Sequence, residues 1–297
     1  MGFRTGVGAL LIAGIGVLVA IDCFVLLPTR PLCSILLVTL AVLGWGEFAR
    51  VTGLRGQGPK AERGLDVLGL ASVLYFFFVA WAFGDASGRA KSLLLGGGES
   101  AWVAGGLFGL IFGAFVVVVF REDYARRYSG LLETIAGVLL LGHLFSYVLR
   151  VYHLPGAEGP IACALFVAGV KGNDTAAYYA GKAWGKRRFL SVSPKKTLEG
   201  CLGAVAFSTA YFGLMGTLPG PAKSFFPWWG GILLGMILSV VSQLGDLAES
   251  LFKRMYQVKD SGAVLPEFGG VLDMIDSLLF TGFVFWAGIQ AARPAGS

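Results

Sequence analysis

Nine stretches of the chain are almost wholly apolar, and each is long enough, or nearly so, to cross a lipid bilayer. A bilayer core is roughly 30 Å thick and an α-helix rises about 1.5 Å per residue, so a span needs about 20 apolar residues. Inside a membrane each backbone polar group must find its partner within the segment, so we expect helices. The stretches lie at 6–28, 32–49, 65–84, 102–120, 130–151, 159–181, 200–219, 227–246 and 274–292.

The composition fits the same class of protein. The chain is 56% hydrophobic and 14% charged, whereas soluble domains are about a quarter charged. The pattern predicts an all-α polytopic membrane protein with about nine transmembrane helices. Residues 1–155 read as generic supporting helices, and residues 156–297 as a region that carries the polar motifs.

The basic residues predict an orientation. With nine spans, the N-terminus and the loops on its side hold 17 Lys and Arg, and the other side holds 6. The positive-inside rule then places the N-terminus in the cytosol and the C-terminus outside, with loops 182–199 and 247–273 cytosolic. Basic loops beside anionic lipid account for the net charge of +6, so no nucleic acid partner is expected.

Charged residues inside a span are costly and point to function. Lys171 and Asp174 fall within 159–181, and Asp174, Tyr178 and Gly181 share one helical face. A basic run follows this span, and basic side chains that anchor a helix end at the interface explain that run. They do not explain Asp174, which we interpret as functional.

The segment "SVSPKKTLEG" precedes the seventh span. Its Ser193, Lys195, Lys196 and Thr197 are residue types that bind phosphate, and Glu199 follows them. Lysines beside the N–H groups of a helix start suit an anion. By itself the segment is also typical of an ordinary solvated loop.

The stretch 245–280 holds six of the eighteen acidic residues. Asp246, Glu249, Ser250 and Lys253 share one helical face, because they are spaced by three, four and seven residues. Asp273 and Asp276 share a face at the start of the ninth span, after a loop that contains Lys259 and Asp260. Two neighbouring helix ends can thus bring carboxylates together, and hard oxygen ligands without a His or Cys cluster favour Mg²⁺. Helix capping and surface ion pairing are the alternative, but they leave Asp246 unexplained.

These motifs resemble the phosphatidate cytidylyltransferases, also called CDP-diacylglycerol synthases. Three segments match that family and follow one another in the family's order: "NDTAAYYAGKAWGK", "SPKKTLEG" and "GDLAES". The resemblance covers roughly residues 160–290. The C-terminal signature, with Arg254 after Lys253 and with Gly269 and Gly270 before Asp273, matches as well. Phe268 stands where the family has His, and Met274 where it has Arg, so any role of those two positions is absent or supplied elsewhere.

The resemblance implies transfer of CMP from CTP to phosphatidate in a bacterial inner membrane, with the active site on the cytosolic side. It implies Mg²⁺, with Mn²⁺ as an alternative and a second monovalent cation, and a homodimer. Metal ligands would be Asp246, Asp273, Asp276 and Asp260. The groups acting on phosphate would be Lys253, Arg254 and Lys259, and the substrate-binding residues would be Asp174, Tyr178, Ser193, Lys195, Lys196, Thr197, Glu199 and Ser250.

Three other interpretations remain open. A cation transporter or channel can use intramembrane aspartates, but the chain shows no inverted repeat. A CDP-alcohol phosphotransferase would carry Asp-Gly-x-x-Ala-Arg, which this chain lacks. A non-catalytic relative is favoured only by Phe268 and Met274.

Overall fold

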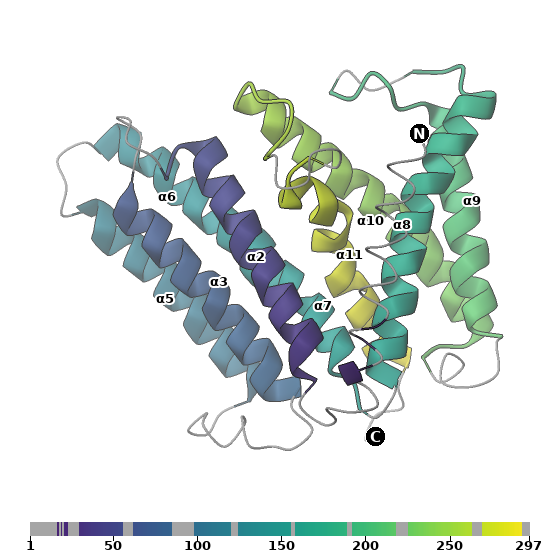
Figure 1. Cartoon of the computed structure of the whole chain (residues 1–297), viewed down its shortest axis with the longest axis horizontal. Coiled ribbons are helices and arrows are strands. Elements are labelled where there is room, and N and C mark those ends of the chain that lie inside the picture. Colours follow the sequence, from purple (N-terminus) through teal and green to yellow (C-terminus); the bar gives the residue numbers. More distant parts are fainter. Residues whose placement is uncertain are drawn as a thin grey trace. The chain divides into compact units, whose positions relative to one another are not determined.

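The fold is seen in a computed structural model (Figure 1). It describes residues 17, 19, 21–22, 30–55, 62–84, 98–119, 124–155, 158–188, 192–217, 225–262 and 269–292. Across these residues the regular secondary structure is helical, and β-structure is limited to isolated bridge residues such as the pair Arg188 and Thr197. The predicted all-α class is confirmed for this part of the chain.

Seven of the described helices are long and apolar enough to cross a membrane, which confirms a polytopic membrane protein. The predicted stretch 159–181 also forms a long helix, but this helix is not among the seven. It carries the polar residues Lys171, Asn173 and Asp174. Most of the stretch 6–28 lies outside the described residues, so the total of nine stays a prediction.

The chain divides into two compact units. The first comprises Met1–Pro155 with Ser261–Leu272, and the second comprises Gly156–Asp260 with Asp273–Ser297. The helices of the first unit are α2 (Pro31–Thr52), α3 (Arg63–Gly84), α5 (Glu99–Val119), α6 (Tyr124–Val138) and α7 (Phe145–Tyr152), with a π-helical segment, Leu139–Leu144, between the last two. The helices of the second are α8 (Glu158–Trp184), α9 (Leu198–Met215), α10 (Trp228–Met255) and α11 (Val271–Ala292), whose first two residues belong to the first unit.

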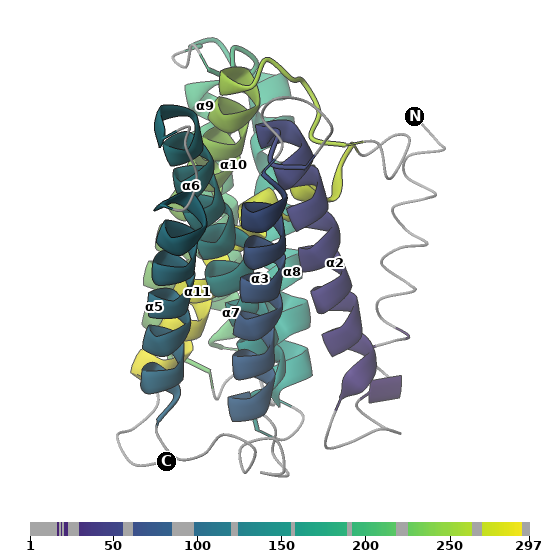
Figure 2. The ribbon, with the colours of Figure 1, turned by 90° about the vertical axis from the view of Figure 1, so that its left-hand side faces the viewer.

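In the first unit α3 contacts both α2 and α5 (Figure 2). Trp45 of α2 is fully buried, and its indole N–H donates to Asp66 of α3 at 2.9 Å. A Cβ added to Gly69 of α3 would lie 2.0 Å from the Trp45 ring. The missing side chain therefore lets α2 and α3 approach, and the large ring fills the space between them.

In the second unit α9 packs closely against α8 and α10. A Cβ on Gly203 of α9 would lie 2.4 Å from that of Ala180 on α8. On the other face of α9, a Cβ on Gly235 of α10 would lie 2.4 Å from the backbone oxygen of Ser208. Small residues at such contacts are the usual means by which membrane helices approach one another.

Aromatic rings fill the core of the second unit. The fully buried Phe285 of α11 stacks on Phe166 of α8, with ring centroids 4.9 Å apart, and lies near Phe212 of α9 and Phe226. This cluster fixes α11 against the helices that carry the polar motifs.

The helix α10 runs nine residues beyond the predicted apolar stretch 227–246, to Met255. The backbone then turns, and Gln257 adopts a left-handed conformation with φ of 57°. The prediction that a helix continues out of this span is confirmed. Its extension carries Glu249 and Lys253, so both stand on rigid backbone.

Candidate active site

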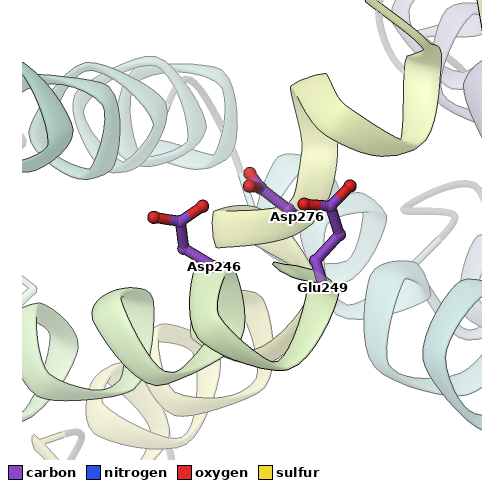
Figure 3. A group of neighbouring side chains, drawn as sticks. All are labelled: Asp246, Glu249 and Asp276. Atoms are coloured by element: carbon purple, nitrogen blue, oxygen red, sulfur yellow. The ribbon is translucent and has the colours of Figure 1, made fainter. Parts of the chain in front are cut away.

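Three carboxylates from α10 and α11 come together in the second unit. Asp246, Glu249 and Asp276 each offer one oxygen, and these oxygens all lie within 4.8 Å of one another. Figure 3 shows Asp246 and Glu249 one turn apart on α10, with Asp276 reaching them from α11. Glu249 and Asp276 are buried. The two helix ends thus converge, as the spacing of the acidic residues predicts.

Lys253 links this group to the next acidic residue on α11. Its ammonium nitrogen lies 2.8 Å from the Glu249 carboxylate, one turn earlier on α10. The same nitrogen lies 2.6 Å from the carboxylate of Asp273. Asp273, predicted as a metal ligand, is therefore ion-paired with Lys253 and stands outside the group of three.

Lys171 of α8 forms an ion pair with Asp276. Its ammonium nitrogen donates to the Ser277 hydroxyl at 2.7 Å and lies 3.7 Å from Asp276 and 3.5 Å from Asp174. Asp174 also accepts from the Ser242 hydroxyl of α10, at 3.3 Å. The two charges that α8 carries into its apolar stretch thus belong to one polar network with α10 and α11.

A cavity of about 360 Å³ opens beside Asp246. Its lining joins all three sequence motifs: the α8 face, the segment before α9, and α10. Six of its residues were predicted as site residues: Asp174, Tyr178, Lys195, Lys196, Thr197 and Asp246. The others are Ala177, Gly181, Lys182, Gly200, Cys201 and Gln243.

Lys196 connects the cavity to the carboxylates. Its ammonium nitrogen lies 2.5 Å from Asp246. Local structure holds it there, because the Lys196 N–H donates to the backbone oxygen of Ser193 at 3.0 Å. Directly after it, Thr197 caps α9 by accepting from the N–H of Gly200 at 3.2 Å. Ser193 and Thr197 therefore shape the turn that presents the lysine.

Glu199 has a structural role in this arrangement. Its carboxylate accepts from the backbone N–H groups of Lys186 and Arg187, at 3.0 and 3.2 Å. It is not among the residues that line the cavity. The contact holds the basic segment after α8 against the start of α9, so Glu199 supports the cavity wall.

The remaining predicted residues lie elsewhere. Arg254, Lys259 and Asp260 are exposed, and Ser250 is half-buried on α10. None of the four lines the cavity, and Asp260 is outside the carboxylate group. Phe268 lies outside the described residues, whereas Met274 is half-buried in the first turn of α11.

Sequence reasoning assigned no role to Glu249, Gln243 or Ser242. The spacing of three residues from Asp246 placed Glu249 on the correct face, but its proximity to Asp276 depends on how α10 and α11 pack. Gln243 and Ser242 are neutral residues of an apolar span and gave no signal beyond their proximity to Asp246.

The carboxylate group fits a hard divalent cation. One oxygen of Glu249, Oε1, is buried and has no hydrogen-bond partner among the described residues. Leaving a buried carboxylate oxygen unsatisfied costs free energy. A cation shared with Asp246 and Asp276 would satisfy it, and carboxylate oxygens are the ligands that Mg²⁺ takes from proteins.

Comparison with known proteins identifies the family. Residues 8–292 match the sequence model of the cytidylyltransferase family. The chain belongs to this family.

Among curated relatives of this cytidylyltransferase, phosphatidate cytidylyltransferase of Bacillus subtilis is 30% identical over 247 residues, which cover 82% of this chain and 84% of the relative. The protein of the same name from Synechocystis is 43% identical over 125 residues, 41% of each chain. That from Aquifex aeolicus is 42% identical over 124 residues, which cover 41% of this chain and 44% of the relative.

Proposed function

We propose that this cytidylyltransferase acts on phosphatidate, transferring CMP from CTP to give CDP-diacylglycerol and pyrophosphate. The relatives named phosphatidate cytidylyltransferase support the substrate. The single observation that carries the proposal is the cavity between α8, the start of α9 and α10, where Asp174, Lys196 and Asp246, each from a different motif, meet. A lipid phosphate in the membrane and a nucleotide from the cytosol can both reach such a site.

In this reaction an oxygen of the phosphatidate phosphate attacks the α-phosphorus of CTP. A P–O bond forms there, and the bond from the α-phosphorus to the oxygen that bridges to the β-phosphorus breaks. Pyrophosphate leaves with that electron pair. Because a phosphate monoester has its second pKa near 6, the nucleophile is already anionic at neutral pH. The chain's residues therefore need to position and neutralise phosphates more than to remove a proton.

The lysines of the cavity are suited to hold the phosphates. Lys196, presented by the turn at 193–197, and the exposed Lys195 would neutralise phosphate charge. We propose that Lys253 neutralises charge at the carboxylate group and orients Asp273, with which it pairs at 2.6 Å. Arg254 and Lys259, both exposed, would attract the nucleotide from solvent.

We propose that Asp246, Glu249 and Asp276 hold Mg²⁺, with Mn²⁺ as an alternative and a monovalent cation as a second ion. Asp273 would support them through Lys253, and Asp260 would act at a distance. When bound, the divalent cation neutralises phosphate oxygens and stabilises the departing pyrophosphate. The protein's own contribution is to fix the carboxylates on two rigid helices.

The setting that we propose is a bacterial inner membrane, with nine spans, the N-terminus and the active site in the cytosol, and the C-terminus outside. The distribution of 17 basic residues against 6 supports it. A homodimer without a nucleic acid partner completes the proposal.

Purified protein in detergent tests the function. It is mixed with phosphatidate, Mg²⁺ and CTP labelled in its α-phosphate, and label that enters the organic phase is counted. We expect Mg²⁺-dependent labelling that EDTA abolishes and that Asp246→Asn loses. Glu158→Gln, at the far end of α8 from Asp174, is the matched control and should label normally. Folded protein that binds CTP but labels no lipid would indicate a non-catalytic relative, and cation flux without CTP binding would indicate a channel.

A further inference from the structure

A buried carboxylate lies in the first unit, on α2. Glu47 is fully buried. Its Oε2 accepts from the backbone N–H of Leu272 at 2.9 Å and from the Ser261 hydroxyl at 3.3 Å. Ser261 and Leu272 are the two ends of the stretch after α10 that belongs to the first unit, and Leu272 already lies in the first turn of α11. One side chain of α2 therefore holds both ends of this stretch.

Two glycines, Gly262 and Gly270, leave room for the Glu47 carboxylate. A Cβ on Gly262 would lie 2.2 Å from Glu47 Oε1, and its three nearest atoms would all belong to the Glu47 side chain. A Cβ on Gly270 would lie 2.4 Å from Oε2. The φ angle of Gly262 is outside the left-handed region, so conformation does not require glycine there. The carboxylate itself occupies the space that a side chain at 262 would need.

The negative charge of the Glu47 carboxylate suits its position at the N-terminal turn of α11. Leu272 is the second residue of α11, and the N-terminal turn of a helix carries a partial positive charge and free N–H groups. A carboxylate buried in a membrane-spanning helix is costly unless such partners satisfy it. Glu47 thus serves as a distant cap for α11, supplied by a residue 225 positions away in sequence.

The residue after Leu272 is Asp273, and Asp276 follows one turn later on the same helix. A helix start that shifts or frays would move both side chains. We propose that Glu47 is a positioning residue: by capping the first turn of α11 it keeps that turn helical, and so keeps Asp273 and Asp276 on their shared helical face. The inference deepens the proposed function, on which its effect on turnover rests.

The first experiment measures metal affinity, which needs no turnover. Mn²⁺ alone is titrated into wild-type protein and variants, and free Mn²⁺ is followed by electron paramagnetic resonance. Partners that orient metal ligands are worth roughly 10- to 100-fold in affinity. We expect Glu47→Ala to weaken Mn²⁺ binding by about tenfold and to raise the Mg²⁺ concentration for half-maximal turnover.

Two variants separate positioning from general loss of packing. Glu47→Gln keeps an oxygen that accepts from Leu272 and should recover most of the affinity. Thr52→Val is the matched control, because Thr52 is a buried polar residue of the same helix whose hydroxyl bonds to Phe48 within α2. It should bind Mn²⁺ as the wild type does.

A double-mutant cycle tests the contact directly. Gly262→Ala alone should weaken Mn²⁺ binding, because the methyl group displaces the carboxylate. In the Glu47→Ala background the same methyl group meets no Glu47 atoms and should have little further effect. Such non-additivity is the signature of two residues that act through one contact.

Wild-type affinity in both Glu47→Ala and Gly262→Ala would overturn the proposal, as would wild-type protein that binds no Mn²⁺. If Glu47→Ala does not fold, Gly262→Ala decides: wild-type affinity in that variant would also contradict the proposal. If the wild type forms no CDP-diacylglycerol while the variants weaken Mn²⁺ binding as expected, the proposed function fails and the positioning role stands.

Discussion

At the scale of single residues, Glu249 offers the most direct test of the carboxylate group. Its carboxylate touches Lys253 on one side and belongs to the group with Asp246 and Asp276 on the other. Glu249→Gln preserves the shape and removes the charge. We expect turnover to fall roughly 10- to 100-fold and the Mg²⁺ requirement to rise, which a Mg²⁺ titration of lipid labelling measures. Glu133→Gln on α6 is the matched control, and equal loss in both variants would contradict the assignment.

Sequence reasoning reached part of this site. Polar residues inside apolar stretches are conspicuous, so Asp174, Asp246 and Asp276 were predicted as site residues, and the structure brings them into one polar region. What the sequence could not predict was which side chain each carboxylate contacts. Spacing alone does not distinguish Asp273, which pairs with Lys253, from Asp276, which meets Asp246, because that depends on how α11 is rotated against α10.

At the scale of elements, the close approach of α9 and α10 depends on glycine. A Cβ on Gly235 would press against the backbone of α9, 2.4 Å from the Ser208 oxygen, and backbone cannot turn aside as a side chain can. Although Ala favours a helix over Gly by about 1 kcal/mol, we expect Gly235→Ala to destabilise the protein by about 1–3 kcal/mol. Thermal unfolding in detergent measures the effect.

Gly109→Ala on α5 is the control for that substitution, because a Cβ there meets nothing within 4 Å. It should leave the unfolding temperature unchanged or raise it. A Gly235→Ala protein as stable as Gly109→Ala would show that α9 and α10 can separate without cost.

The apolar pattern predicted these elements well, since every long stretch from 32 onward falls on a helix. The reason is physical: a membrane span must be helical and must have a minimum length. Hydropathy marks the apolar part of a helix and not its end. The helix α10 continues beyond residue 246 to Met255, and it was the spacing of Asp246, Glu249 and Lys253 that predicted this continuation.

At the scale of the whole molecule, the orientation in the membrane decides which solvent the cavity meets. Nucleotide is cytosolic, so the cavity lysines can act on CTP only if the segment 182–199 is on that side. The basic residues predict this. The prediction can be tested with single cysteines in a chain whose own four cysteines are replaced by serine.

Arg187→Cys, an exposed position after α8, should react with a membrane-impermeant maleimide in inside-out vesicles and not in intact cells. Lys91→Cys, in a segment assigned to the opposite side, should show the reverse and serves as the matched control. Labelling of Arg187→Cys from outside the cell would place the loop, and with it Lys195 and Lys196, away from cytosolic nucleotide. Since the cavity is built from those same lysines together with Asp246, that outcome would remove the physical basis for CTP as the donor even if the family assignment stands.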